Sequence, residues 1–541
     1  MGRRRDYYRH TALISSLTLL SRVLGVVRDV ACASIFGAGM VWDAFSFAWR
    51  VPNLFRRLFG EGALTAAFLP VFTEYLRQKG RRHAWQLLGV VGSLTALVLL
   101  GCVLLGEALA FFLPHVVDLS ERWRLAVALT AVLLPYMVFV CLTALAGAAL
   151  NSLKHFSAPA LAPIVINLCW IVSVLVVAPR VSSKPSQQIF VVAAGILVAG
   201  ALQLGLQLSV LSGKGAEWWP SLSISDPGVK RIGKAMAPVA LGMAAFQVNV
   251  LLDGVIAISL AAPAGEGSFV LFGRSLPYPM EIGANSVLWY ASRLMQFPLG
   301  VFGIALATAI FPALSDRAAD GEWEEFDRTL TDGLGATLFI GIPAGIGLMV
   351  VGRPAVELLF EHGEFTARAT ARTAGALFCY STGIWAYCAY HVLTRAYYSL
   401  EDSVTLARVA GFAVLLNVVL NLTLIWFLGA SGLALATALS SAVQCAILYL
   451  ILRRKGRSPE QLRLLATLIK TLLAGAAMAA LCLVIVRVVI PPVPGAGLPR
   501  ELGRLLLPVA AGALLFFALA RALNVPEARL VTRIIRRRWR K

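Results

Sequence analysis

The chain has 541 residues, of which 59% are hydrophobic and only 14% are charged. Soluble globular proteins carry roughly 45–50% apolar and about 25% charged residues, so this composition excludes a soluble multidomain enzyme. The formal net charge of +20 leaves two explanations, namely nucleic-acid binding or the positive cytoplasmic loops of a polytopic membrane protein. The positions of the apolar runs and of the basic residues decide between them.

Long apolar runs recur along the whole chain, and a helix needs about 20 mostly apolar residues to cross a bilayer. We therefore predict an all-α polytopic membrane protein with 14 transmembrane helices. The predicted spans lie near residues 11–37, 42–76, 84–113, 124–150, 157–179, 188–211, 235–262, 286–314, 330–351, 370–398, 404–428, 431–452, 464–490 and 503–523. The first apolar run is too long for a cleaved signal peptide and has no small-residue cleavage site.

Basic residues concentrate on one side of this predicted topology. An even number of spans places both termini on the same side, and residues 3–9 and 529–541 are rich in arginine. The loops assigned to that side also hold most of the remaining Lys and Arg residues. Because cytoplasmic loops carry the excess of basic residues, both termini are predicted to be cytoplasmic. This topology explains most of the net charge, so we expect no nucleic-acid partner.

An internal repeat divides the predicted helices into two sets of six. The matching segments are residues 47–60 with 290–303, 63–74 with 305–316, and 151–154 with 398–401. Apolar helices also resemble each other by chance, but Arg50 aligns with Arg293 and a proline and an acidic residue recur at one spacing. We predict an N-lobe at 1–215, a C-lobe at 216–455, and a third region at 456–541 with two added helices and a basic tail. Two halves with the same orientation predict an axis along the membrane normal and a central cavity.

Ionisable residues inside the spans are the first functional candidates, because each costs about 2.5–3.5 kcal/mol at a helix centre. They are Arg22, Arg28 and Asp29 in span 1, Arg50, Arg56, Arg57 and Glu61 in span 2, and Arg293 in span 8. The planar guanidinium group suits phosphate and carboxylate, so several arginines predict an anionic substrate such as a diphosphate. For a single arginine, snorkelling to the headgroups or pairing with Asp29 or Glu61 is the alternative.

A second polar set suggests a cation site. Asp253 lies alone in span 7, Asn417 and Asn421 share one face of span 11, and Thr437 lies in span 12. Their oxygen atoms suit a small hard cation. The alternative is hydrogen bonding between helices, which is a common role of Asn and Thr in membranes.

Enzyme signatures are missing from the sequence. There is no Walker A motif, no GxSxG and no HExxH. The eight cysteines lie almost wholly inside spans without CxxC spacing, which indicates packing residues rather than a metal site or disulfides. We expect neither catalytic activity nor a cofactor, apart from the candidate cation.

Several motifs resemble those of one membrane protein family. They lie at residues 21–29 (SRVLGVVRD), 36–39, 43–45, 52–62, 67–70 and 293–303 (RLMQFPLGVFG). Together they resemble the MurJ (MviN) lipid II flippases of the multidrug/oligosaccharidyl-lipid/polysaccharide exporter superfamily, over essentially the whole chain. The resemblance implies two six-helix lobes around a central cavity, with a groove for the polyprenyl tail at the two C-terminal helices. It also implies transport by alternating access of undecaprenyl-diphosphate-linked disaccharide pentapeptide from the cytoplasmic to the periplasmic leaflet of the bacterial inner membrane.

The resemblance also implies roles for individual residues. The positions that match family positions important for transport are Arg22, Arg28, Asp29, Asp43, Arg56, Glu61 and Arg293. The positions that match a sodium site of the family are Asp253, Asn417 and Thr437, while Asn421 stands where that site has an aspartate. One carboxylate of the sodium site is therefore missing. Loop 263–285 is longer than is usual in the family, and its segment 269–276 is a candidate for the outer membrane surface.

We therefore expect a lipid II flippase of peptidoglycan biosynthesis, acting in cell-wall biogenesis and cell shape, with lipid II and membrane lipids as partners and a monomeric state. The alternatives in the same class are a flippase for another polyprenyl-diphosphate-linked glycan and a cation-coupled exporter. A membrane glycosyltransferase would need a catalytic carboxylate in a sizeable extramembrane loop, and the loops here are short. A non-transporting scaffold would gain nothing from the insertion cost of the arginines.

Overall fold

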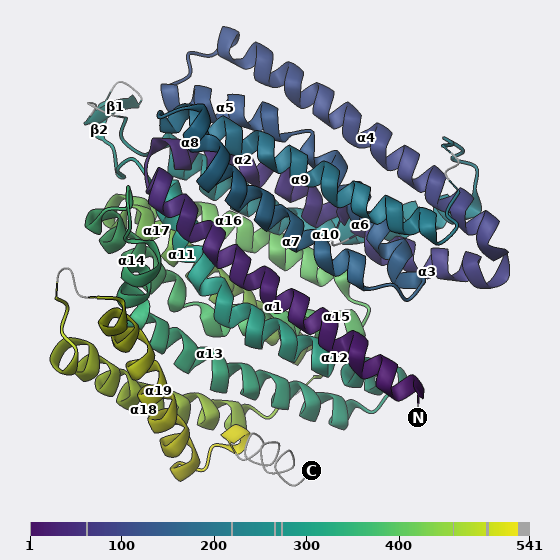
Figure 1. Cartoon of the computed structure of the whole chain (residues 1–541). Helices are drawn as coiled ribbons and strands as arrows, with labels where there is room; N and C mark the ends of the chain where they lie inside the picture. Colours follow the sequence, from purple (N-terminus) through teal and green to yellow (C-terminus); the bar gives the residue numbers. More distant parts are fainter. Residues whose placement is uncertain are drawn as a thin grey trace. The chain divides into compact units, whose positions relative to one another are not determined.

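The computed structural model describes residues 2–60, 63–217, 220–263, 267–271, 274–457, 459–493 and 497–528. Within these ranges, the side chains of residues 2–14, 60, 63, 66, 237–246 and 271 are not described. The chain forms two compact units, Met1–Ser259 and Leu260–Lys541. Figure 1 shows that long helices dominate both units.

The first unit is entirely helical in its described part. Its elements are α1 (Gly2–Phe36), α2 (Met40–Phe55), the π-helical segment η1 (Arg56–Gly60), α3 (Ala63–Gln78), α4 (Gly80–Val116), α5 (Glu121–Leu133), α6 (Tyr136–Ser152), α7 (Ser157–Val172), the π-helical segment η2 (Ser173–Val177), α8 (Ala178–Val181), α9 (Pro185–Gly213) and α10 (Pro227–Ser259). Part of its core joins α3, α4 and α6, where Phe72 stacks on Phe68 and contacts Trp85. Aromatic side chains supply much of the buried apolar area in such a core.

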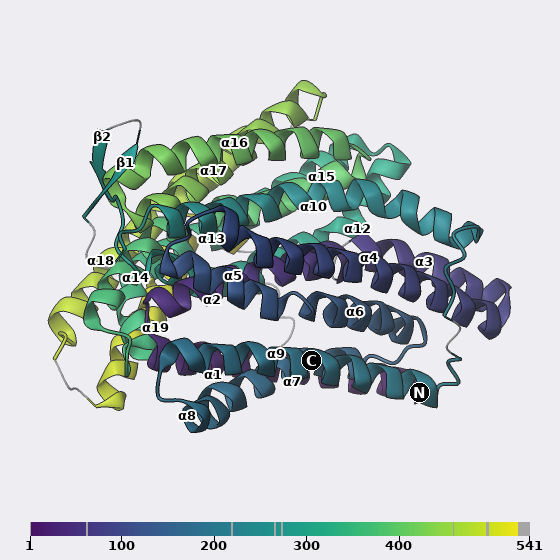
Figure 2. The same cartoon turned by 90° about the horizontal axis from the view of Figure 1, so that it is seen from above.

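The second unit adds one small β-hairpin to its helices. Its elements are β1 (Ser268–Leu271), β2 (Arg274–Pro277), α11 (Ala284–Pro298), the π-helical segment η3 (Leu299–Gly303), α12 (Ile304–Asp320), α13 (Trp323–Phe360), α14 (Ala367–Ser381), α15 (Ile384–Ser399), α16 (Ser403–Leu428), α17 (Ala430–Arg454), α18 (Gln461–Val484), the π-helical segment η4 (Ile485–Val489) and α19 (Leu498–Ala522). Helices α16 and α17 pack along each other (Figure 2).

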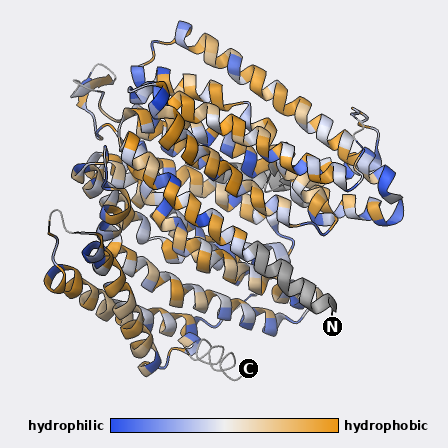
Figure 3. Cartoon of the chain, viewed as in Figure 1, coloured by the Kyte–Doolittle hydropathy of each residue, from blue (hydrophilic) through white to orange (hydrophobic). Residues whose placement is uncertain are grey.

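Ten helices of the described residues are long and apolar enough to cross a membrane. Many large apolar side chains on them are exposed; on α4 these include Leu97, Leu104 and Phe111. Figure 3 shows α4 as mainly hydrophobic along its length, with hydrophilic residues near its ends. A long apolar surface of this kind requires lipid around it rather than water. The prediction of an all-α polytopic membrane protein is therefore confirmed.

The predicted number of 14 spans is not confirmed. The other four predicted spans, 11–37, 42–76, 235–262 and 370–398, fall on α1, on α2 with α3, on α10, and on α14 with α15. These four regions are not among the ten helices of the described residues that are long and apolar enough to cross a membrane. For α14 and α15 the physical reason is the break at Thr382 and Gly383, which leaves two short helices.

The predicted repeat has a counterpart in local structure. The aligned residues 56–60 and 299–303 are both π-helical, as η1 and η3. The aligned residues Lys154 and Glu401 both have positive φ angles, 59° and 56°, a conformation that L residues seldom adopt. Uncommon backbone features at aligned positions are not expected by chance, so they support the predicted repeat. The predicted division at residues 215 and 455 stays a prediction, while α10 packs against α2 and α3 within the first unit.

Candidate functional site: a buried arginine in the first unit and an aromatic-bound arginine in the second

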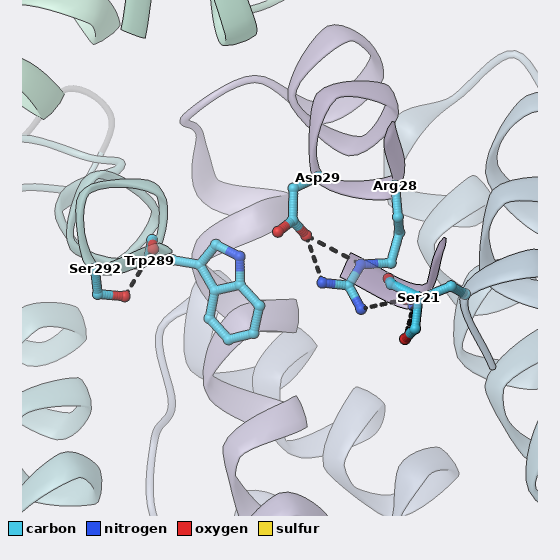
Figure 4. Close-up of polar contacts among 6 residues, drawn as sticks. Ser21, Arg28, Asp29, Trp289 and Ser292 are labelled. Carbon is cyan, nitrogen blue, oxygen red and sulfur yellow. Dashed lines mark hydrogen bonds and ion pairs between the residues drawn. The ribbon is translucent and has the colours of Figure 1, made fainter. Parts of the chain in front are cut away.

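Arg28 lies in the last third of α1, with its side chain only 12% exposed. Its Nε and Nη2 atoms both donate to Oδ1 of Asp29, at 3.0 and 2.7 Å (Figure 4). The carboxylate is equally enclosed, with 10% of its side chain exposed. Because removal of one partner would leave an uncompensated buried charge, this pair fixes both groups in place.

Asn167 on α7 completes the surroundings of Arg28. Its Oδ1 accepts a hydrogen bond of 3.0 Å from Nη1 of Arg28. Its Nδ2 donates to the backbone oxygen of Ser21 on α1, at 3.1 Å. A Cβ atom on Gly25 would lie 3.9 Å from the same Nδ2 atom, an ordinary van der Waals distance, so the amide packs against this turn of α1. One asparagine therefore ties α7 to α1 and orients the guanidinium group.

Trp170, one turn after Asn167, covers Arg28 from another side. The guanidinium carbon lies 4.6 Å from the centroid of its ring. A cation held over an indole face gains about 0.5–2 kcal/mol, more when it is shielded from water. Trp170 is itself buried among Phe45 and Trp49 of α2. The result is a rigid, apolar wall beside a permanently charged group.

The remaining predicted residues of the first unit occupy different places. Arg22 is exposed on α1. Asp43 is fully buried in the first turn of α2, where the helix dipole favours a carboxylate. Arg56 opens η1 and donates from Nε to Oδ1 of Asn53, at 2.8 Å. Glu61 lies outside the described residues.

Arg50 contacts α10, which the sequence motifs did not indicate. Its Nη1 donates to the backbone oxygen of Val250 on α10, at 3.1 Å. A Cβ atom on Gly254 would lie only 2.4 Å from that Nη1 atom. Glycine at this position therefore lets the guanidinium group lie directly on the backbone of α10, one residue from Asp253.

In the second unit, Arg293 lies on α11 and is half-buried. Its guanidinium carbon is 4.3 Å from the ring centroid of Trp289, one turn earlier on the same helix. The backbone oxygen of Trp289 accepts a hydrogen bond of 2.8 Å from Ser292 (Figure 4). Each unit thus holds one candidate arginine against an indole ring.

The proposed cation ligands form a hydrogen-bonded group within the second unit. Asn421 donates from Nδ2 to Oδ1 of Asn417, at 2.8 Å. Asn417 donates in turn to Ser440 at 3.3 Å and to Thr437 at 3.5 Å, both on α17. These bonds join α16 to α17 through buried amides, as expected for polar contacts between membrane helices. Asp253 belongs to the first unit.

The sequence indicated the arginines and Asp29 as a pairing partner, but not the roles of Asn167 and Trp170. Asn167 and Trp170 stand out only once α7 is known to pack against α1. Among the described residues, no group of three His, Cys, Asp or Glu side chains is arranged to hold a metal ion. What the two arginine sites offer chemically is fixed positive charge beside an aromatic wall, which suits an anion with an attached apolar or sugar portion.

Sequence comparisons give a consistent result. The profile of the family described as lipid II flippase MurJ matches residues 32–495. A probable lipid II flippase MurJ of Vibrio cholerae is 36% identical over 456 residues, which cover 82% of each chain. One from Haemophilus influenzae is 32% identical, over 86% of this chain and 90% of the relative. A lipid II flippase MurJ of Burkholderia cenocepacia is 30% identical, over 86% and 88%.

Solved structures show the same fold. A structure described as lipid II flippase MurJ in an inward closed conformation matches with a TM-score of 0.73 at 24% identity, over 94% of this chain and 98% of that chain. An inward-facing MATE family multidrug resistance transporter of the MOP superfamily matches with a TM-score of 0.65 at 12% identity, over 82% and 97%. At these identities the matches concern the fold alone.

Proposed function

Since the chain belongs to the lipid II flippase MurJ family, we propose that it carries lipid II from the cytoplasmic to the periplasmic leaflet by alternating access. The observation that carries this proposal is Arg28, a guanidinium group enclosed within a membrane helix bundle. A charge in this position costs about 2.5–3.5 kcal/mol, which the pairing with Asp29 offsets in part, and the donors left after this pairing are proposed to bind an anionic substrate.

The surroundings of Arg28 suit the diphosphate of lipid II. A guanidinium group has five N–H donors, and the bonds to Asp29 and Asn167 use three of them. The remaining donors suit phosphate oxygens, which guanidinium groups bind in a bidentate manner. Asp29 and Asn167 keep the group oriented before the substrate arrives, so little side-chain order has to be gained on binding. Arg293, held by Trp289, is proposed to supply a second cation.

The decisive experiment measures lipid II exposed on the outer leaflet of cells whose own flippase has been depleted and replaced by this chain. We expect the unsubstituted chain to restore lipid II exposure. Arg28→Ala or Arg293→Ala should abolish at least 90% of that exposure, a tenfold loss that corresponds to about 1.4 kcal/mol. Arg124→Ala is the matched control, because Arg124 pairs with Asp118 on an exposed surface and should not affect transport. Normal transport by folded, inserted Arg28→Ala and Arg293→Ala variants would contradict the proposal.

The aromatic contact can be tested separately from the charge. Trp170→Phe keeps a ring beside the guanidinium group of Arg28, whereas Trp170→Ala removes it. We expect Trp170→Phe to transport at a reduced rate and Trp170→Ala to lose most transport. Equal transport by both variants would show that the ring serves packing only.

Two alternatives in the same class remain as outcomes of this experiment. A flippase for another polyprenyl-diphosphate-linked glycan would fail to restore lipid II exposure while supporting that other pathway. A cation-coupled exporter is disfavoured because cationic substrates would meet Arg28 and Arg293. We further propose that transport involves no chemical step, so the purified chain should neither polymerise nor hydrolyse labelled lipid II.

The ion requirement is proposed from the donor set. Of the four residues proposed for the cation, Asn417, Asn421 and Thr437 bring amide and hydroxyl groups, the one carboxylate is that of Asp253 in the first unit, and the Oδ1 atom of Asn417 already accepts a hydrogen bond. We expect transport that does not depend on sodium. A fall in transport when sodium is replaced by potassium would contradict this, and Asn421→Asp tests whether a carboxylate creates sodium dependence.

Topology and assembly complete the proposal. The basic residues at both ends of the chain favour cytoplasmic termini, which reporter fusions at residues 1 and 541 would test. We propose a monomer, and the measurement is the mass of the purified chain in nanodiscs. A dimer mass at low protein concentration would contradict it.

A further inference from the structure

The β1–β2 hairpin is the one non-helical element among the described residues, and transport as proposed above assigns it no role. Its strands pair antiparallel, with Phe269 opposite Leu276 and Val270 opposite Ser275. An isolated two-stranded hairpin is marginally stable at best in water. This one therefore needs a surface against which to pack.

One face of the hairpin rests on the end of α16. The ring of Phe269 lies 6.4 Å from that of Trp426, with their planes 21° apart. The ring of Tyr278, just beyond β2, lies 5.0 Å from Phe269 on the hairpin side. Figure 2 shows the two strands beside this end of α16. The hairpin is thereby held at the level of the last turn of a membrane helix.

The level of that last turn can be derived from the helix itself. Helix α16 has 26 residues, or about 39 Å at 1.5 Å per residue, while the hydrocarbon core is about 30 Å thick. Trp426 in its last turn therefore lies near the boundary between acyl chains and headgroups, where tryptophan is enriched in membrane proteins. Phe427 and Leu428 beside it are exposed as well, so apolar surface continues up to the hairpin.

The other face of the hairpin is open. Side chains alternate between the two faces of a strand, so Val270 and Ser275 lie opposite the face that packs on Trp426. Val270 is 73% exposed, and both residues are exposed within the second unit. Arg274, at the end of the hairpin, is exposed too. The open face thus carries a valine and a serine close to an exposed arginine, a mixture of apolar, polar and cationic groups that suits the headgroup layer, where water and lipid are both in reach.

We propose that the β1–β2 hairpin is a lipid-binding element that lies in the headgroup layer, with Val270 and Ser275 against lipid. In the orientation proposed above, this is the outer leaflet. The depth assignment itself does not depend on that orientation or on the substrate.

The hairpin is followed in the chain by α11. The segment that follows β2 is held by α14, where Arg368 pairs with Glu281 at 2.6 Å. Arg372 donates to the backbone oxygen of Ile282 at 2.7 Å, two residues before α11 begins. The start of α11, the helix of Trp289 and Arg293, is thereby held by α14 on one side and joined to the hairpin on the other.

The test is a depth measurement with spin labels on the full chain in nanodiscs. Single cysteines at Val270→Cys and Ser275→Cys report on the open face. Glu364→Cys, in an exposed loop of the same unit, is the aqueous reference, and Leu422→Cys on the apolar surface of α16 is the lipid reference. The eight native cysteines are buried or half-buried, so the labelled unsubstituted chain supplies the background to subtract.

We expect labels at Val270 and Ser275 to have an oxygen-to-nickel-chelate accessibility ratio several-fold above that at Glu364, and below that at Leu422. Labels at both positions that match Glu364 would overturn the proposal. A second measurement uses Val270→Asp together with Ser275→Cys, because a carboxylate in the headgroup layer opposes lipid contact. Nickel accessibility at Ser275 should rise in this variant, and an unchanged value would also count against lipid contact.

Discussion

The thiol of Cys141 on α6 donates a hydrogen bond to the backbone oxygen of Phe55, 3.6 Å away, where α2 passes into η1. The register that aligns residues 151–154 with 398–401 also aligns Cys141 with Cys388 on α15. Cys388 packs against Gly303, the last residue of η3. Each unit therefore places a cysteine at one of its π-helical segments, beside the start of η1 in the first unit and against the end of η3 in the second. Such segments disturb the regular backbone ladder and often mark functional positions in helices.

The packing at η3 predicts a large effect of a single methyl group. A Cβ atom on Gly303 would lie 2.8 Å from Sγ of Cys388 and 3.3 Å from its Cα. Gly303→Ala should lower the free energy of unfolding by about 1–3 kcal/mol, because overpacking forces neighbouring atoms to shift. Unfolding of the purified chain in mixed micelles measures this.

The same position offers its own control. Cys388→Ala removes the sulfur, so the double variant should recover part of the loss, while the contact with Cα persists. A double-variant cost equal to the sum of the single costs would show that the sulfur is not the obstacle. Gly411→Ala is the matched control for adding a methyl group to a helical glycine, since nothing lies within 4 Å of its Cβ position.

A pair of hydroxyl groups is also duplicated between the units. Thr73 donates to Oγ of Ser152 at 3.2 Å, and the aligned pair Ser315 and Ser399 is 3.3 Å apart. Hydrogen bonds between membrane helices average about 0.6 kcal/mol in double-mutant cycles. We expect coupling energies of about this size for Thr73→Val with Ser152→Ala and for the corresponding serine-to-alanine pair in the second unit. A coupling energy within about 0.2 kcal/mol of zero in either cycle would mean that this hydrogen bond does not stabilise the folded chain.

Much of the fold followed from the sequence because apolar runs and basic loops obey simple physical rules. The six-helix repeat was visible because Arg50 and Arg293 stand at one spacing in otherwise similar helices. The π-helical character of η1 and η3 had no signal, since it depends on how neighbouring helices pack around residues 56–60 and 299–303. The break between α14 and α15 was also missed, because residues 370–398 were interpreted as one span despite Thr382 and Gly383 in its middle.

The candidate site was predicted less completely than the fold. Buried arginines such as Arg28 stand out, because a charge in an apolar run is unusual. Two of the groups that hold Arg28 do not, since Asn167 and Trp170 lie far away in sequence and are unremarkable until α1 packs on α7. The strand pairing at residues 268–277 was missed for another reason, although segment 269–276 was a candidate for the outer membrane surface. A four-residue strand in an interhelical loop is too short for its alternation to be distinguished.

Glu357 on α13 forms two ion pairs, one with a buried arginine and one with an exposed arginine. Arg504 of α19 donates from Nη1 to its Oε2, and Arg353 donates from Nε to its Oε1, both at 2.9 Å. The side chain of Arg504 is 10% exposed and that of Arg353 is 66% exposed.

We expect Arg504→Ala to lower the free energy of unfolding by about 3 kcal/mol, because it removes the buried partner of Glu357 and a contact between α13 and α19. Arg353→Ala should cost less than about 1 kcal/mol, since water screens an exposed pair. Unfolding in mixed micelles measures both variants. Equal costs for the two substitutions would contradict the assignment of burial as the cause.

Asp402, in the turn before α16, provides a prediction about pH. Burial raises the pKa of its carboxyl group, but hydrogen bonds from Lys455 and Thr405 outweigh burial and hold the pKa below its ordinary value. The carboxylate also caps α16 by accepting a hydrogen bond of 3.1 Å from the backbone nitrogen of Thr405. A carboxyl group whose pKa is lowered by folding stabilises the folded chain above its unfolded pKa, near 3.9, and loses that contribution as the pH falls through its folded pKa.

Two variants separate the charge of Asp402 from the cap. Asp402→Asn keeps a good helix cap but cannot titrate, whereas Asp402→Ala loses about 1 kcal/mol of cap energy at every pH. The unsubstituted chain should therefore be more stable than Asp402→Asn at pH 7, and the difference should shrink as the pH falls from about 5 to below the folded pKa. The measurement is the midpoint of thermal unfolding in detergent across this range. If the difference between the two chains is constant with pH, the carboxylate charge does not stabilise this turn and the pair with Lys455 contributes nothing.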